Sequence, residues 1–282
     1  MKKYILVVIF GLSLLACKQE PKTVVVKKTA PERHQPKNVA YQWQNAKEWL
    51  ASTTDSSAIR IALAVNRTDK IHFVKMDSVI VPTDFSGDIE YYLPFPFKVK
   101  ALENVNKIIF FSYPSQTFAT YENGELTYTG PTNMGRKADQ TPTGLFFTNW
   151  KAEETTSTFN DEWDLKWNFN IANKLGVGWH QYELPGYPAS HSCLRLQEKD
   201  ARYLYEWADQ WILLDNNTIS VKGTPVIVFG AYDFEAAKPW SQLVANPKAL
   251  DISEEEITKH VSPFLKTIMT EQQKRIKYQG KK

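Results

Sequence analysis

Short apolar runs separated by turn residues dominate the middle of the chain. The strand-like segments are IRIALAV (ending at Val65), SVIVP (78–82), KIIFFSY (107–113), TPTGLFFTNW (141–150), WNFNIA (167–172), GVGWHQY (176–182) and GTPVIVFG (223–230). In YENGELTYTG, two alternating runs are joined by Asn123-Gly124, the dipeptide preferred in tight hairpin turns. The pattern therefore predicts a mainly β fold, with a sandwich or barrel-like sheet.

Helical spacing interrupts this β pattern in three places. Asp200 can cap a helix that runs through DARYLYEWADQWILL, soon after one of the two cysteines. The spacing of apolar residues in YQWQNAKEWLAS predicts a helix over 41–52. Near the C-terminus, Ser253 followed by EEEI is a helix start, and Pro263 interrupts the helical segment. We therefore expect helical N- and C-terminal extensions around the β domain.

The start of the chain has the residue order of an export signal. In MKKYILVVIFGLSLLACKQE, two lysines precede an apolar run that ends at the small residue Ala16. The run is too short for a comfortable membrane span. Its end, LLAC, resembles the lipobox of bacterial lipoproteins, in which Cys17 carries the lipid. We therefore expect an exported, membrane-anchored lipoprotein that faces the periplasm, with the outer membrane favoured.

Together these patterns divide the chain into five parts. They are the lipoprotein signal peptide 1–17 with Cys17, a flexible tether 18–40, an N-terminal extension or small subdomain 41–105, the β domain 106–232, and a helical C-terminal extension 233–282. The tether is predicted from its proline and lysine content and its few large apolar residues.

Composition excludes some classes of function and draws attention to one cysteine. The formal net charge is +3, and the chain has no glycine-rich phosphate loop, so nothing argues for a nucleic-acid partner. A disulfide between Cys17 and Cys193 is one interpretation for an exported protein with two cysteines. If Cys17 carries lipid, however, Cys193 has no intramolecular partner. A lone exported thiol is open to oxidation, which favours a functional role for Cys193.

Two histidines accompany Cys193 in the sequence. His180 ends the strand-like GVGWH, and His191 precedes the cysteine in PASHSCLRL. A neighbouring imidazole can take a thiol's proton and make it a nucleophile, and the backbone N–H groups of Ser192 and Cys193 are candidate oxyanion donors. We expect Trp179, next to His180, in the wall of such a site.

Three other interpretations of these residues stay open on residue chemistry alone. Zinc binding lacks a fourth ligand and C-x-x-C spacing, so we predict no metal and no cofactor. His191 could be a structural histidine bonded to backbone, and Cys193 could be an inert buried thiol.

The ordered set His180, PGYPASHSCLRL and DARYLY resembles the signature of the L,D-transpeptidase catalytic domain. In that family an upstream histidine precedes a Ser-His-Gly-Cys segment, an apolar residue and an Arg or Asn. The family also has an Asn-Gly hairpin and a Thr-Pro-x-Gly segment before the site, which correspond here to YENGELTYTG and TPTG. The resemblance runs from about Lys107 to Gly230 and makes 106–232 the predicted catalytic domain.

The resemblance assigns roles to individual residues. It implies that Cys193 is the nucleophile and His180 the general base. His191 matches a second histidine that shapes the pocket, Ser190 a hydroxyl residue beside it, and Arg195 a position that contacts loop backbone or substrate.

Two positions depart from the family pattern. Ser192 replaces the family glycine, which costs on the order of 1 kcal/mol if the backbone there needs a positive φ. In an ordinary backbone region, Ser192 would only add a hydroxyl near the oxyanion site. Gln181 stands where the family often has a small residue and bears on how His180 is held.

The implied reaction is acyl transfer on a peptidoglycan stem tetrapeptide through a Cys193 thioester, with release of D-Ala. The acceptor is an amine of a second stem or a protein lysine, while water as acceptor would make the enzyme an L,D-carboxypeptidase. Two different functions stay open: an inactive wall-binding lipoprotein, and a thiol hydrolase that acts on a different amide. The expected partners are thus peptidoglycan and, through the N-terminal lipid, the membrane.

Overall fold

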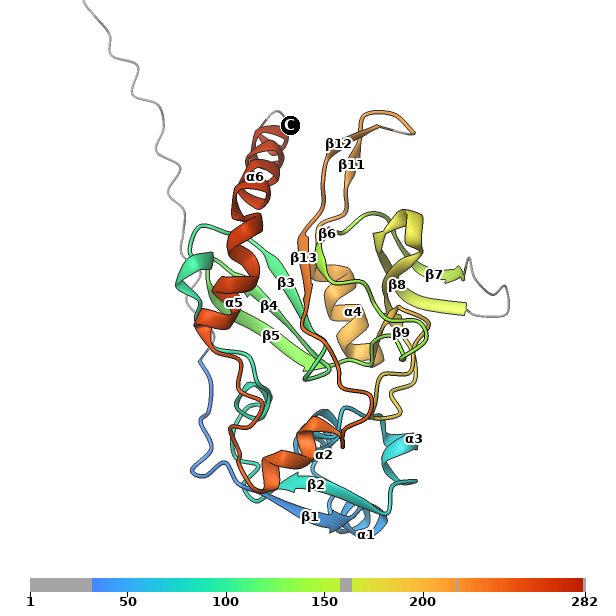
Figure 1. Ribbon diagram of the computed structural model, residues 1–282, viewed down its shortest axis with the longest axis vertical. Helices are drawn as coiled ribbons and strands as arrows, with labels where there is room; N and C mark the ends of the chain where they lie inside the picture. The colour runs from blue at the N-terminus through green and yellow to red at the C-terminus, as the bar shows by residue number, and fades with distance from the viewer. Residues whose placement is uncertain (1–31, 158–163, 217, 281–282) are drawn as a thin grey trace, which may run out of the picture.

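The computed structural model describes residues 32–157, 164–216 and 218–280, and its thirteen strands form two large sheets and two small ones (Figure 1). The five-stranded sheet has the order β5-β4-β3-β13-β6, with β3 Ile108–Ser112, β4 Thr117–Glu122, β5 Glu125–Pro131, β6 Gly144–Phe147 and β13 Pro225–Phe229. The four-stranded sheet has the order β10-β9-β8-β7, with β7 Lys151–Thr156, β8 Asp164–Ala172, β9 Val177–Gln181 and β10 Leu194–Leu196. The small sheets pair β1 Tyr41–Asn45 with β2 Ser78–Pro82, and β11 Ile212–Leu213 with β12 Ile219–Val221.

Six α-helices complete the described fold. They are α1 Ala46–Ser52, α2 Ser56–Val65, α3 Lys70–Phe73, α4 Glu198–Trp207, α5 Glu254–Val261 and α6 Leu265–Gln279. Short 3₁₀ helices lie at Ile89–Tyr92, Lys100–Leu102, Asn173–Leu175, Pro239–Val244 and Ser262–Phe264. The predicted mainly β fold, with a helix after Cys193 and helical extensions, is confirmed.

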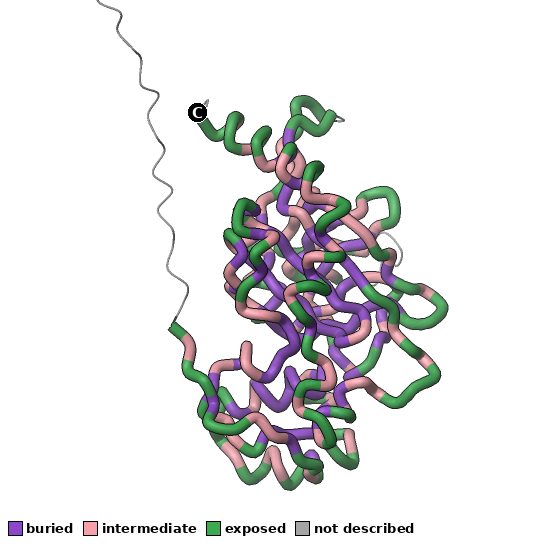
Figure 2. The backbone as a smooth tube through the Cα atoms, turned by 60° about the vertical axis from the view of Figure 1, so that its left-hand side comes forward, coloured by how far each residue is buried: buried purple, intermediate pink, exposed green. Residues whose placement is uncertain are grey.

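The central strand β3 is apolar at successive positions because both of its faces are covered. Ile109 and Phe111 belong to the core that the five-stranded sheet shares with β8, β9 and α4. Ile108 and Phe110 point to the other face, into a second core closed by the C-terminal helices α5 and α6. Figure 2 shows the resulting band of buried backbone through the middle of the molecule.

Two predicted elements in the N-terminal extension are wrong in type. The predicted helix over 41–52 begins instead as β1, which pairs with β2, and becomes helical only after Asn45, whose side chain accepts the N–H of Glu48. IRIALAV forms the last seven residues of α2, a helix capped by Asp55. Its last five residues are all buried, so the helix lacks the polar stripe that would distinguish it from a buried strand.

Other local signals are confirmed, with one correction. Asn123 and Gly124 both have positive φ in the β4–β5 turn, and the Ser253 hydroxyl caps α5. Asp200, however, does not cap α4: it lies in the first turn, buried, where its carboxylate accepts the Tyr128 hydroxyl at 2.7 Å. Burial raises the pKa of Asp200 to about 6.

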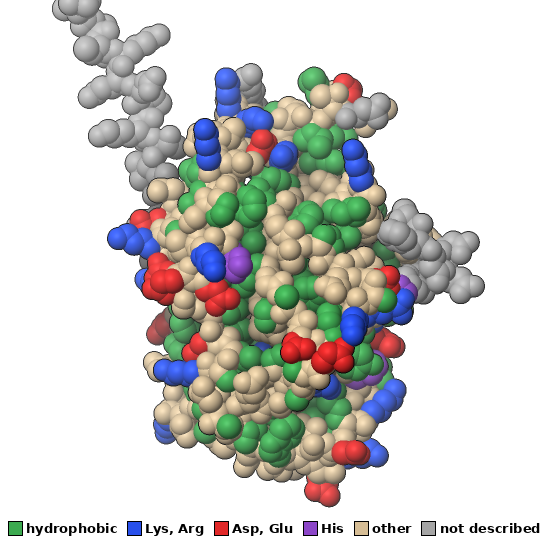
Figure 3. Space-filling view, viewed as in Figure 1, with side chains coloured by type: hydrophobic (Ala, Val, Ile, Leu, Met, Phe, Trp, Pro, Cys, Tyr) green, Lys and Arg blue, Asp and Glu red, His purple; other side chains and the backbone are tan. Residues whose placement is uncertain are grey.

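The N-terminal extension forms a separate lobe below the two large sheets, together with the 3₁₀ segment Pro239–Val244 (Figure 1). Residues 32–40 contact this lobe, since backbone N–H groups of His34 and Lys37 donate to Asp88 and Asp84. The predicted signal peptide, with Cys17, lies outside the described residues. Among the described helices, none has the length and apolar content needed to cross a membrane. On the face drawn in Figure 3, basic and acidic side chains are interspersed.

Candidate active site

The candidate site lies on the face of the four-stranded sheet opposite α4. Strand β10 runs parallel to β9, with Leu194 opposite Trp179 and Arg195 opposite His180. Because side chains alternate along a strand, Trp179 and His180 point to opposite faces. Trp179 is fully buried in the core against Phe169, so the prediction that it walls the site is wrong.

The neighbouring strand β8 extends this face. Asn170 is opposite Gly178 in the antiparallel β8–β9 pair, and Cys193 directly precedes Leu194 on the other side of β9. Gly178 is required there, because a Cβ would lie 2.4 Å from the Phe169 carbonyl oxygen. Glycine at this position therefore lets the β8 backbone approach β9 closely.

Five of the six predicted site residues line one pocket on this face: His180, Ser190, His191, Cys193 and Arg195. Ser192 is not among its lining residues. Sequence reasoning missed the opposite wall, which contains Trp150, Asn168, Asn170 and Asn173. No motif marks these residues, although the alternation of polar and apolar residues in WNFNIA placed two asparagines on one face.

His180 is buried and is held in one tautomer. Its Nδ1 lies 2.9 Å from the Gln181 carbonyl oxygen, which can only accept, so Nδ1 carries the proton and Nε2 keeps its lone pair. Burial lowers the pKa of His180 to about 4, against the effect of this hydrogen bond, and the charge of Arg195 lowers it further. The imidazole is therefore neutral at neutral pH and can accept a proton.

Cys193 is half-buried beside the backbone of the segment that enters β9, with Sγ 3.9 Å from the Gly176 carbonyl oxygen. Burial raises the pKa of its thiol, while a hydrogen bond from the Gly178 backbone and the charge of Arg195 oppose the rise. The resting pair is therefore a neutral thiol and a neutral imidazole at neutral pH. Such a pair needs proton transfer to His180 as the sulfur attacks.

This pairing predicts how Cys193 reacts with iodoacetamide. The alkylation rate of Cys193 should increase with pH, because the thiolate is the reacting form. Since burial raises the pKa of the Cys193 thiol, we expect the midpoint of this increase to lie at higher pH than that of glutathione, measured in parallel. Arg195→Gln should move the midpoint to still higher pH, and Arg195→Lys should restore it. A midpoint below that of glutathione would contradict this account of the site.

Residues 190–193 form a tight turn that presents the cysteine. The Ser190 hydroxyl donates to the Cys193 carbonyl oxygen at 2.5 Å, and the Thr141 hydroxyl donates to the Ser192 carbonyl oxygen at 2.9 Å. Ser192 has φ 72°, in the left-handed region that favours glycine. Among the described residues, the backbone N–H groups of Ser192 and Cys193 donate no hydrogen bond, which leaves both for an oxyanion.

The left-handed conformation of Ser192 gives a stability prediction. Ser192→Gly should increase the free energy of unfolding by about 0.5–1 kcal/mol, net of the hydroxyl's bond to the His191 carbonyl oxygen. The matched control is Gly144→Ala: Gly144 has φ 124° and open space around its Cβ position, so only backbone strain should lower stability. Urea unfolding measures both changes. Destabilisation by Ser192→Gly would contradict the strain argument.

Arg195 and His191 bound the pocket in different ways. The Arg195 guanidinium lies 4.4 Å from the Tyr182 ring centroid, which holds its charge near Cys193. His191 is exposed at the pocket mouth, with Nδ1 3.2 Å from both an Asp139 carboxylate oxygen and Arg136 Nη2. These two contacts hold the His191 side chain at the mouth of the pocket.

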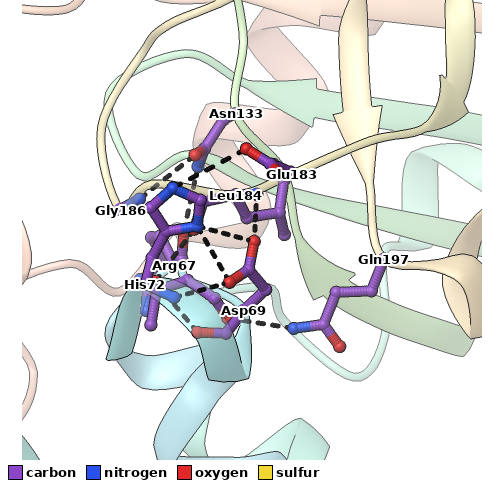
Figure 4. Close-up of polar contacts among 9 residues, drawn as sticks. Arg67, Asp69, His72, Asn133, Glu183, Leu184, Gly186 and Gln197 are labelled. Atoms are coloured by element: carbon purple, nitrogen blue, oxygen red, sulfur yellow. Dashed lines mark hydrogen bonds and ion pairs between the residues drawn. The ribbon is translucent and has the colours of Figure 1, made fainter. Parts of the chain in front are cut away.

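The N-terminal lobe holds the loop 182–189 that leads into this turn. The Asp69 carboxylate accepts the N–H of Leu184 at 2.7 Å, and the Asp69 N–H donates to the Leu184 carbonyl oxygen. Figure 4 shows His72 between the carboxylates of Asp69 and Glu183, and Asn133 next to Gly186. We call the Asp69–Leu184 contact pair the loop clamp; its residues carry no recognisable sequence signal.

Comparison with known proteins agrees with the geometry. Residues 106–228 match the family model of the L,D-transpeptidase catalytic domain. No curated protein matches the chain.

Among solved structures, the chain is similar to three L,D-transpeptidases. That from Stackebrandtia nassauensis is 24% identical, with 45% of this chain and 57% of that one covered and a TM-score of 0.37. One from Mycobacterium smegmatis is 19% identical, with 44% and 59% covered and a TM-score of 0.35. One from Mycobacterium tuberculosis is 20% identical, with 44% and 58% covered and a TM-score of 0.35.

The chain thus spans less than two thirds of the length of each of these proteins. The family match covers the two large sheets except the last residue of β13, the helix α4, and every predicted residue of the catalytic site. Residues 106–228 of this chain therefore belong to the L,D-transpeptidase catalytic domain family.

Proposed function

We propose that the protein is an L,D-transpeptidase that acts on peptidoglycan stem peptides through a Cys193 thioester. One observation carries the proposal: His180, with a free Nε2 lone pair, and Cys193 line the same pocket inside a domain of this family. The two free backbone N–H groups in the 190–193 turn add the donors that acyl transfer needs.

The acylation step uses these groups in sequence. Cys193 Sγ attacks the carbonyl carbon between the L-configured centre of the diamino acid and the terminal D-Ala, while His180 Nε2 takes the thiol proton. The carbonyl oxygen becomes an oxyanion that the N–H groups of Ser192 and Cys193 can receive. The C–N bond then breaks, and His180 returns the proton to the D-Ala amine as it leaves.

The second step regenerates the thiol. An amine attacks the thioester carbonyl, gives a proton to His180, and forms an amide as Cys193 Sγ leaves and is reprotonated. An amine from a second stem gives a cross-link, a protein lysine gives a protein–wall link, and water gives carboxypeptidase activity. The neutral His180 suits this cycle because it can accept a proton in each step.

The proposed location follows from the start of the chain. The order of basic, apolar and small residues before Cys17 supports export and lipidation, and a tether after Cys17 would let an anchored domain reach the wall. We propose a lipoprotein facing the periplasm, with the outer membrane favoured. Metabolic labelling with a palmitate analogue should mark the protein and fail to mark Cys17→Ala.

Intact mass spectrometry of the protein with disaccharide-tetrapeptide tests the reaction. We expect a covalent adduct that peptide mapping places on Cys193, together with released D-Ala. Product masses then distinguish cross-linking from hydrolysis. A folded protein that forms no adduct and releases no D-Ala would favour an inactive wall-binding protein, with Ser192 as the first position to test.

A further inference from the structure

Asn168 is a buried polar residue without a protein partner in the pocket. Its side chain is 5% exposed, and its Nδ2 is fully buried with no hydrogen-bond partner among the described residues. A buried amide N–H group without a partner is unfavourable in the free protein. Such a group is expected where a ligand supplies the missing acceptor.

A β-bulge aims Asn168 into the pocket. Lys166 is opposite Gln181 and Phe169 is opposite Trp179, so two residues of β8, Trp167 and Asn168, together face His180. Trp167 has φ 54°, an uncommon conformation for a bulky residue.

The bulge also sets which side chains reach which face. The Trp167 ring packs on α4, 5.2 Å from the Arg202 guanidinium carbon and 5.5 Å from the Tyr205 ring. After the bulge, Phe169 continues into the core, whereas Asn168 lines the pocket. The bulge therefore places Asn168 next to His180, on the side of β9 away from Arg195.

The other asparagines of this wall are already engaged. Asn170 Oδ1 accepts from Asn149 Nδ2 at 2.9 Å, and Asn173 Oδ1 accepts from Trp150 Nε1 at 3.0 Å. Trp179 Nε1 and Gln181 Oε1 are also buried without a partner, but neither residue lines the pocket. Among the described residues, Asn168 alone combines an unpartnered buried donor with a place in the pocket wall.

We propose that Asn168 is a substrate-binding residue whose Nδ2 donates a hydrogen bond to an oxygen of the acyl-donor peptide. The inference rests on the proposed function. Adjacent strands lie about 5 Å apart, so Asn168 reaches a group beyond the carbonyl that Cys193 attacks. The acceptor is either the terminal carboxylate of the stem peptide or a neighbouring amide carbonyl, since both present the sp² oxygen that an amide donor prefers.

Asn168→Leu tests the proposal because leucine has nearly the same shape and no donor. Binding of disaccharide-tetrapeptide is measured by calorimetry on full-length Cys193→Ala protein, with and without Asn168→Leu. We expect the dissociation constant to rise about tenfold. The same peptide with a C-terminal carboxamide separates the two acceptors: an effect only on the carboxylate form identifies the carboxylate, and an equal effect identifies an internal carbonyl.

Thermal unfolding distinguishes substrate binding from a structural role. Asn168→Leu removes an unpartnered donor, so its melting temperature should equal or exceed that of the parent protein. The matched change in the same wall, Asn173→Leu, deprives Trp150 of its acceptor and should lower it. A large fall in melting temperature for Asn168→Leu would overturn the proposal.

The outcomes for the inference and for the proposed function are separate. Unchanged peptide affinity in Asn168→Leu, with D-Ala released by the parent enzyme, overturns the inference and leaves the function. Weakened peptide binding in Asn168→Leu without any D-Ala release from the parent supports the inference and overturns the function. A parent protein that does not bind the peptide at all overturns both.

Discussion

Replacing Cys193 with alanine is expected to abolish both the acyl-enzyme and D-Ala release, with a fall in kcat of at least about 10⁴-fold. The reaction as proposed has no other nucleophile: the nearby hydroxyl of Ser190 is buried and donates to the Cys193 carbonyl oxygen. Stopped assays of D-Ala release and intact mass spectrometry measure the loss.

The fold should survive this substitution. The thiol contacts only backbone groups, the Gly176 carbonyl oxygen at 3.9 Å and the N–H of Gly178, and hydrogen bonds to sulfur are weak. The melting temperature of Cys193→Ala should therefore stay close to that of the parent. An adduct or D-Ala release that persists in folded Cys193→Ala would show that another group attacks the peptide, and the proposed function would be wrong.

Replacing His180 with asparagine should lower kcat/KM about 10²–10⁴-fold. The asparagine amide can occupy the position of Nδ1 and still donate to the Gln181 carbonyl oxygen, so the change removes mainly the basic Nε2. His191→Asn is the matched control at the pocket mouth and should cost much less, because His191 is exposed and contacts Asp139 and Arg136.

The pH profile makes this prediction specific to the proton transfer. Burial lowers the pKa of His180 to about 4, so the parent's kcat/KM should fall on the acid side near pH 4, well below the value for an ordinary histidine. Because the folded state resists protonation of His180, this residue's contribution to stability is present above about pH 6.5 and is lost as pH falls toward 4. An acid limb near pH 6.5, or one unchanged in His180→Asn, would exclude His180 as the base.

Strands and turns of the β domain could be predicted from the sequence because their signals are local. The Asn123-Gly124 turn and the apolar β3 need only neighbouring residues to be recognised. That α2 is a helix could not be predicted, because a helix buried around most of its circumference has a continuous apolar run like that of a buried strand. β1 depends on pairing with β2, more than thirty residues later.

Some residues of the candidate site could likewise be predicted from the sequence, and others could not. His180, Cys193 and Arg195 are close in sequence and meet through adjacent parallel strands, so spacing and resemblance found them. Asn168 lines the pocket because of a bulge, which the sequence does not reveal. Trp179 is buried in the core because neighbouring side chains of a strand point to opposite faces, so its position next to His180 was evidence against a place in the pocket wall. The loop clamp needs the contact of two lobes, which no local pattern encodes.

The coverage of β3 on both faces has a consequence for the minimal stable protein. The second core is completed by Val99 and Leu102 before the family match and by Ile257 and Val261 after it. Trimmed to 106–228, the chain would turn the Phe110 side of its central sheet to water and leave the Leu184 N–H without Asp69. We therefore expect the segment that matches the family model to be smaller than the unit that unfolds cooperatively, because the flanking segments complete its second core.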